Sequence, residues 1–114
     1  MYNAAFADLD GVAPPQTEFD DVSPFIYVVR VRPDLRMDLI AHLRARGVAT
    51  GIHFLAAHRF TFYASAPRGP LPVTEQVVEE VVTLPLHSHM RREDAERVIE
   101  GVVSFARQRR RRAA

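Results

Sequence analysis

Histidine and aromatic residues gather in one stretch of the chain, residues 47–63, with the sequence GVATGIHFLAAHRFTFY. An imidazole in such a stretch can hydrogen-bond a hydroxyl, a ketone or a carboxylate, and it can exchange a proton near neutral pH. We expect His53 to lie on a short strand, residues 48–54, with its ring on the face opposite Ile52 and Phe54. Two interpretations stay open: a histidine that contacts a ligand, and a structural histidine at a strand end.

His58 and Tyr63 lie five residues apart on an expected helical turn, residues 56–63. Tyr63 could stack on a sugar or hydrogen-bond a sugar or a phosphate. The alternative is that Tyr63 packs with Phe60 and Phe62 in the core, because clustered aromatic side chains are usually buried. Ligand contact and core packing both remain open for this turn.

The basic residues of the chain are all arginines. Because there is no lysine among the 15, no side chain can supply the amine of a Schiff base. Arg59 and Arg68 could pair with a pyrophosphate, since a guanidinium matches two phosphate oxygens. Solvated loop arginines are the competing interpretation for both.

The sequence predicts no metal site and no catalytic residue of its own. There is no cysteine, which excludes disulfides, thiolate zinc sites and cysteine nucleophiles. His87 and His89 form an H-x-H pair, but the nearest acids, Glu93 and Asp94, are typical first-turn helix charges. The serines lack the histidine and aspartate context of a nucleophile.

The alternation of strand and helix patterns predicts one α+β domain. Residues 25–32 form the clearest strand, and a helix begins at Pro33 and stops at Gly47. Thr74 is the expected N-cap of a second helix, before a strand over residues 82–86 and a final amphipathic helix. We therefore expect a small, mostly antiparallel sheet of about three strands with helices on one face.

Residues 1–106 are expected to form this single domain, and residues 107–114 a frayed, solvated basic tail. A formal charge of +1 gives no whole-chain attraction to nucleic acid or anionic membrane, although the tail alone could bind phosphate through counterion release. The chain shows no signal peptide and no apolar run near the roughly 20 residues of a membrane span. We expect a soluble, cytoplasmic chain that binds neither membrane nor nucleic acid.

Four sequence blocks carry a resemblance to a known family: FIYVVRV (25–31), GVATGIHFLAAHRFTFY (47–63), LPVTE (71–75) and LPLHSHM (84–90). In order and approximate spacing they resemble the C-terminal small domain of the DegT/DnrJ/EryC1/StrS sugar-nucleotide aminotransferases, across about residues 20–105. The GIHF…AAH…Y version is most similar to enzymes that aminate 4-keto sugar nucleotides, such as those making 4-amino-4-deoxyarabinose or perosamine. The chain departs from the family pattern at Ser23-Pro24 and at Arg91-Arg92, where a threonine usually caps the last helix.

The resemblance implies a fold-type I enzyme that uses pyridoxal phosphate (PLP) to move an amino group from glutamate to a keto sugar nucleotide. It places the lysine and the cofactor contacts in a large domain that this chain lacks, so we expect no covalently bound cofactor and no activity from the chain alone. The implied substrate-binding residues are His53 and Phe54, followed by His58 and Tyr63. The implied partner is a PLP-binding large domain or a second copy of the chain. The alternative is a stand-alone, non-catalytic binding or dimerisation module derived from the family.

Overall fold

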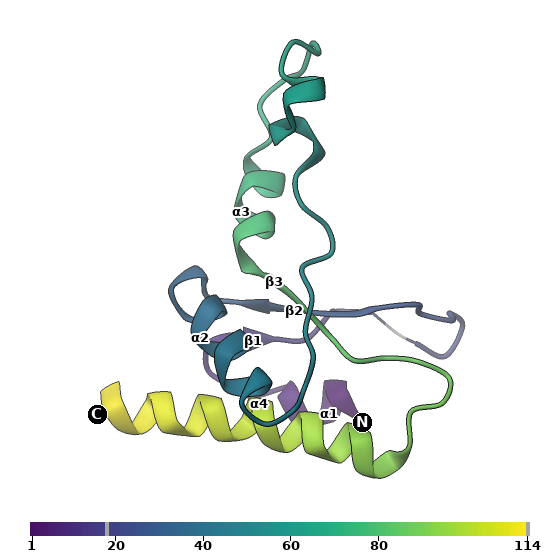
Figure 1. Cartoon of the computed structure of the whole chain (residues 1–114), viewed down its shortest axis with the longest axis vertical. Helices are drawn as coiled ribbons and strands as arrows, with labels where there is room; N and C mark the ends of the chain where they lie inside the picture. Colours follow the sequence, from purple (N-terminus) through teal and green to yellow (C-terminus); the bar gives the residue numbers. More distant parts are fainter. Residues whose placement is uncertain (18, 114) are drawn as a thin grey trace.

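A three-stranded antiparallel sheet forms the centre of the chain, with β2 between β1 and β3 (Figure 1). The computed structural model describes residues 1–17 and 19–113. Glu18, in a polar loop that the sequence predicts at residues 16–24, and Ala114 of the expected tail lie outside the described residues. The strands are β1 (Val12–Ala13), β2 (Tyr27–Val31) and β3 (Val81–Leu84). Val29 lies opposite Val82, and Tyr27 opposite Leu84. The predicted α+β class with a small antiparallel sheet is confirmed.

Strand β2 alternates between buried and more exposed side chains. Tyr27, Val29 and Val31 are buried, whereas Arg30 points outward and pairs with Glu80 at 2.6 Å. Successive side chains of a strand point to opposite faces, so this pattern places one face of β2 in the core. All four residues of β3 are buried, as expected for a strand that is covered on both faces.

The strand predicted for residues 48–54 is wrong. Only Gly51 pairs with the sheet, through a single bridge to Thr83 with N···O distances of 2.7 and 3.0 Å. After this bridge the chain turns away from the sheet edge. The third strand is instead β1, which pairs Val12 with Val31. With two residues, β1 is too short to show any periodicity in the sequence.

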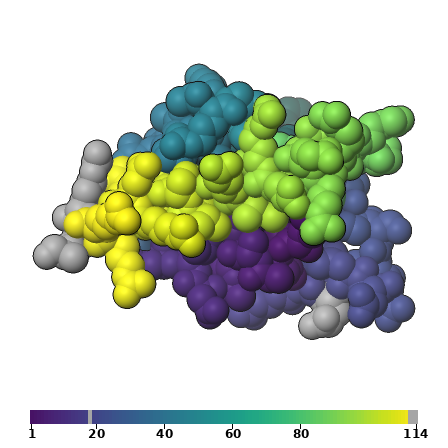
Figure 2. All heavy atoms as spheres, turned by 90° about the horizontal axis from the view of Figure 1, so that it is seen from below, coloured from purple at the N-terminus to yellow at the C-terminus, as the bar shows by residue number. Residues whose placement is uncertain are grey.

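The described residues form four helices: α1 (Tyr2–Phe6), α2 (Pro33–Arg44), α3 (Pro72–Glu80) and α4 (Arg92–Ala113). Helix α4 lies between α1 and α2 and contacts both, as Figure 2 shows from below. The predicted N-cap at Thr74 is wrong, because α3 begins two residues earlier. Pro72 occupies its first turn, where the fixed φ of proline fits and its missing N–H costs nothing.

Helix α2 ends as the sequence predicts. Gly47 adopts a φ of +72°, its N–H donates to the Arg44 carbonyl at 3.0 Å, and the Val48 N–H donates to the Leu43 carbonyl at 3.0 Å. These two bonds form a Schellman motif, in which a left-handed residue closes the helix and satisfies its last carbonyls. Leu43 and Val48 both belong to the core, so the motif also turns the chain inward.

Helix α4 includes residues 107–113, which the sequence assigns to a frayed basic tail. The Arg109 guanidinium lies 5.4 Å from the Phe105 ring centroid and forms an ion pair with Asp38 of α2. At the other end, the Asp94 carboxylate accepts the backbone N–H of Arg91 at 3.1 Å. This bond is one half of a capping box. It helps to stabilise the start of α4, where the family pattern has a threonine cap.

The core lies between the sheet and helices α1, α2 and α4. Its largest fully buried side chains are Phe6, Leu39, Leu43, Leu84, Val29, Val31, Val82 and Val102. Helices α2 and α4 approach closely at Gly101, where a Cβ atom would lie 2.7 Å from Leu43 Cδ2. None of the described helices combines the length and the apolarity needed to cross a membrane.

Residues 52–80 form a projection that we call the arm. It runs out through two 3₁₀ turns, η1 (Ala57–Arg59) and η2 (Thr61–Tyr63), and returns through a loop and α3. Figure 1 shows the arm standing away from the sheet and from α4. The radius of gyration is 15.6 Å, compared with about 13 Å for a compact chain of this length. The arm accounts for this extended shape.

Leu43→Ala tests the packing of α2 against α4. Leu43 is fully buried, so we expect a loss of about 2–5 kcal/mol in the free energy of unfolding, measured by urea titration. Met37→Ala on the same helix is the control, because Met37 is exposed and should lose less than about 0.5 kcal/mol. Equal losses in the two variants would contradict this description of the core.

Candidate functional site

His53 lies at the base of the arm, beside the edge of β3. Its Nδ1 atom is 3.0 Å from the Thr83 hydroxyl oxygen, and its ring lies over Gly51, where a Cβ atom would be 2.5 Å from the ring. Gly51 therefore provides the space that the ring occupies, and Thr83 fixes one of its nitrogens. Thr83 is itself buried, so this anchor is part of the rigid body of the chain.

The Nε2 atom of His53 has no hydrogen-bond partner within residues 1–17 and 19–113, and the residue is exposed. Since Thr83 holds Nδ1, the other nitrogen is free to donate to or accept from a ligand. The Phe54 ring lies edge-on to the His53 ring at 5.2 Å and is 65% exposed. The expectation that the two rings lie on opposite faces is wrong, because this segment is not a strand.

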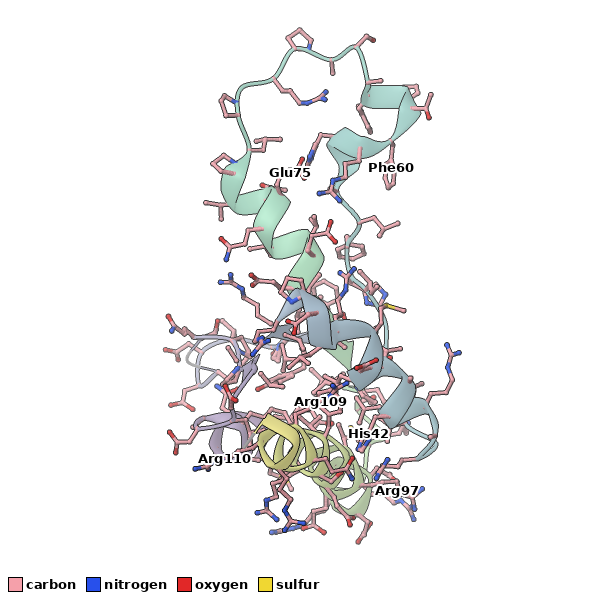
Figure 3. All side chains as sticks on the ribbon, turned by 90° about the vertical axis from the view of Figure 1, so that its left-hand side faces the viewer. His42, Phe60, Glu75, Arg97, Arg109 and Arg110 are labelled. Carbon is pink, nitrogen blue, oxygen red and sulfur yellow. The ribbon has the colours of Figure 1, made fainter. Side chains whose placement is uncertain are left out.

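His58 is turned inward, across the arm. Its side chain is only 15% exposed, and its Nε2 donates to one carboxylate oxygen of Glu75 on α3. The other carboxylate oxygen of Glu75 accepts from Arg59, whose Nε lies at 3.0 Å. His58 and Arg59 are consecutive residues of η1, so the carboxylate of Glu75 binds two adjacent side chains of this turn. Figure 3 labels Glu75 on α3 and Phe60 on the opposite leg of the arm.

Ion pairing occupies one of the two candidate phosphate-binding arginines. Arg59 contacts Glu75 and also Glu79, the latter at 2.6 Å, and both contacts raise the pKa of its guanidinium. Hydrogen bonds lower the pKa of the Glu75 carboxyl from 4.5 to about 2, and the bond from Arg59 contributes more than the bond from His58. Arg68 donates only to the Tyr63 carbonyl, at 3.3 Å, among the contacts within the described chain. Arg68 is thus the arginine of the arm with uncompensated charge.

The aromatic cluster of the arm is not part of the core. Phe62 is 86% exposed, and Phe60 and Tyr63 are both close to half exposed. The Tyr63 ring meets Phe62 edge-on at 5.0 Å. The interpretation of these three residues as core is therefore wrong, and their rings are available to a ligand or to another protein surface.

The structure brings the four predicted substrate-binding residues onto one arm but not into one cluster. His53 and Phe54 are in contact at its base, whereas His58 faces Glu75 and Tyr63 lies farther out on η2. The described residues contain no group of three histidine or acidic side chains placed to hold a metal ion. With no lysine, the chain also lacks a side chain that fits covalent attachment of PLP.

Two comparisons identify the relatives of the chain. The model of the DegT/DnrJ/EryC1/StrS aminotransferase family matches residues 1–103. The chain belongs to this family. A relative from Streptomyces venezuelae, dTDP-3-amino-3,4,6-trideoxy-alpha-D-glucose transaminase, is 35% identical over 108 residues, which cover 92% of this chain and 28% of the relative.

Solved structures of the family share the fold. S. venezuelae DesV, in complex with a ketimine intermediate, superimposes with a TM-score of 0.80 at 34% identity, covering 92% of this chain and 29% of DesV. The aminotransferase TlmJ from Streptoalloteichus hindustanus gives 0.79 at 28% identity, covering 91% of this chain and 28% of TlmJ. Family members bind PLP: Spr1654 from Streptococcus pneumoniae is known in a PLP form. The chain thus spans somewhat more than a quarter of the length of these relatives.

Three residues that shape the site were missed by the sequence interpretation: Gly51, Glu75 and Thr83. Glu75 ends the LPVTE block that contributes to the family resemblance, and Thr83 is the polar residue inside the apolar run VVTLPL. A polar residue at a buried strand position needs a hydrogen-bond partner, which could have indicated Thr83. The pairing of Glu75 with η1 spans 16–17 residues, and no local pattern predicts it.

Gly51→Ala tests how the His53 ring is held. The backbone of Gly51 is outside the left-handed region, so alanine is allowed, but its Cβ would collide with the His53 ring. We expect the ring to leave Thr83, with changed His53 ring NMR shifts and a stability change below about 1 kcal/mol. Gly69→Ala is the control, because a Cβ there meets open space. Unchanged His53 shifts in Gly51→Ala would contradict the arrangement.

The Glu75 contacts should weaken in acid. Its pKa is lower in the folded chain than in the unfolded chain, so the contribution of Glu75 to stability is fully present above about pH 4.5 and is lost as the pH falls toward about 2. We expect the Ala57 methyl NMR shift to titrate across this range in the wild type but not in Glu75→Gln. Identical titration curves for the two proteins would show that Glu75 does not hold η1.

Proposed function

We propose that this chain forms one wall of the sugar-nucleotide site of a PLP-dependent aminotransferase, as the small domain of the complete enzyme. In this proposal the enzyme moves an amino group from glutamate to the ketone of a nucleotide sugar. Support comes from the family membership and from the substrates named for the relatives. The amine that binds the cofactor belongs to residues outside these 114, since no side chain here can supply it.

The observation that carries the proposal is the hydrogen bonding and exposure of the His53 ring. Thr83 holds one ring nitrogen at 3.0 Å, and the other nitrogen of this exposed residue has no hydrogen-bond partner among the described residues. Such an imidazole is preorganised to hydrogen-bond a hydroxyl or carbonyl of a ligand, because its orientation is already fixed before binding. The exposed Phe54 ring beside it offers an apolar face on which a sugar can pack.

The described residues bind and orient, and they do not carry the amino transfer itself. That chemistry belongs to the cofactor and its lysine. His53 and Phe54 would contact the sugar at the base of the arm, and Tyr63 would contact the ligand farther out. Arg68 is the arm residue whose charge suits the diphosphate, since its guanidinium is not neutralised by an acid within the described chain.

The position of the ketone separates two versions of this proposal. The GIHF…AAH…Y block resembles enzymes that aminate C4, whereas the S. venezuelae relative is named for a sugar that carries its amino group at C3. The complete enzyme should accept one of these keto sugars with a kcat/KM at least tenfold above the other. Assays with matched 3-keto and 4-keto dTDP sugars would decide between the two versions.

A stand-alone docking or dimerisation module is the second candidate, and the exposed apolar residues favour it. The arm exposes the large apolar side chains of Phe54, Leu55, Phe60, Phe62, Tyr63, Leu71 and Val73. A monomer rarely leaves such a surface uncovered. This candidate predicts a stable homodimer of the 114-residue chain with no affinity for nucleotide sugars. Sedimentation that shows a monomer without a partner would exclude it.

His53→Ala tests the proposed function. Measured in the complete enzyme, the variant should raise the KM or Kd for the nucleotide sugar about tenfold, because a lost hydrogen bond to a ligand costs about 1–2 kcal/mol. His89→Ala is the control, since His89 is exposed and bonds only to neighbouring Ser88 among the described residues. Wild-type binding and turnover by His53→Ala would contradict the proposal.

A further inference from the structure

We propose that Glu75 is a positioning residue, which fastens the outgoing leg of the arm to α3 and so sets the shape of the substrate wall. This inference rests on the proposed function for its role, but its geometry is independent of any ligand. It changes the interpretation of His58, which the family resemblance suggests as a substrate contact. His58 is instead one of the two groups that Glu75 holds.

The first argument is the geometry of the carboxylate. One oxygen of Glu75 accepts from His58 Nε2, and the other accepts from Arg59 Nε at 3.0 Å and from its Nη2. The two Arg59 donors converge on a single carboxylate oxygen, so both bonds are assisted by charge. Because His58 and Arg59 are adjacent in η1, the three side chains fix the rotation of this turn as well as its distance from α3.

The second argument is the lack of any apolar core in the arm. Of residues 52–80, only Ala56 is buried, and every residue from Arg59 to Thr74 is exposed. Hydrophobic burial, which holds the sheet and helices α1, α2 and α4, therefore contributes little to the shape of the arm. Isolated surface ion pairs are weak, but in the arm there is little apolar burial to outweigh them. The ion pairs can therefore decide the shape of the arm.

The third argument is that the contacts continue into the body. Arg59 also binds Glu79 at 2.6 Å, and Glu79 lies 3.6 Å from the guanidinium of Arg36 on α2. Arg36 in turn donates to the Val78 carbonyl at 2.7 Å and is only 17% exposed. The path from η1 through α3 to α2 thus connects the outer part of the arm to a rigid helix.

The consequence concerns which groups face the ligand. His58 and Arg59 are both paired with Glu75, so Tyr63 and Arg68 are the candidate ligand-binding residues that remain available on the outer arm. In the proposed enzyme, Glu75 would act on the substrate through these residues and would not touch it. Loss of Glu75 should therefore weaken sugar-nucleotide binding without changing the chemical step, a rise in KM with kcat nearly constant.

Glu75→Ala provides the direct test in the ligand-free chain, by amide hydrogen exchange. Residues 57–64 should exchange about 3- to 10-fold faster than in the wild type, as expected for the loss of a few exposed ion pairs. Exchange in β2 and β3 should stay unchanged. The matched control is Glu96→Ala, which breaks the exposed pair with Arg92 on α4 and should leave the arm as it is. Unchanged exchange at residues 57–64 in Glu75→Ala overturns the inference.

Titration with a nucleoside-diphosphate sugar separates this inference from the proposed function. In the complete enzyme, Glu75→Ala should raise KM with kcat retained, and Glu75→Asp should recover part of the loss because it keeps the charge. If Glu75→Ala speeds amide exchange in the arm but even the wild type does not bind nucleotide sugars, the positioning role of Glu75 stands and the proposed function is rejected. A fall in kcat with KM unchanged, or Glu75→Asp behaving like Glu75→Ala, would overturn the positioning role.

Discussion

Thr83 meets the base of the arm through three contacts, and the rest of the site depends on them. Its backbone N–H donates to Gly51 at 2.7 Å, its carbonyl accepts from Gly51 at 3.0 Å, and its hydroxyl lies 3.0 Å from His53. Thr83 is buried, with 7% of its surface exposed. A buried hydroxyl without a partner would be costly, so His53 satisfies Thr83 as much as Thr83 orients His53.

Beyond the bridge between Gly51 and Thr83, the shape of the arm depends mainly on polar contacts. The body has a continuous apolar core from Phe6 to Phe105, whereas the arm has almost none. Segments with few buried apolar contacts open with low free energy, and binding sites are commonly built from such segments. The arm of this chain fits that description, since it carries the four candidate substrate residues and the ion pairs around Glu75.

Sequence patterns predicted the strand and the helix that pack into the core. The strand at residues 25–32 and the stop of α2 at Gly47 could be predicted, because burial and backbone geometry impose them locally. The strand expected at residues 48–54 failed because pairing with β3 ends after Gly51. The core-packing interpretation of the arm aromatics rested on the usual burial of clustered rings, and it is wrong. Here the chain leaves the sheet before it reaches them.

The candidate site was only partly predictable. The family blocks led to His53 and Phe54, but the partner of each histidine lies on another element, Thr83 on β3 and Glu75 on α3. These long-range pairings hold the exposed His53 beside Thr83 and turn the His58 side chain, which is 15% exposed, toward Glu75. The sequence places both histidines in the same motif and gives no reason to separate them.

We propose that the base of the arm faces the sugar of a nucleotide sugar in the complete enzyme. Intermolecular nuclear Overhauser effects between sugar protons and the rings of His53 and Phe54, in the complete enzyme, test it most directly. We expect such effects at both rings and none at His58. A bound nucleotide sugar that shows no contact with either ring would contradict it.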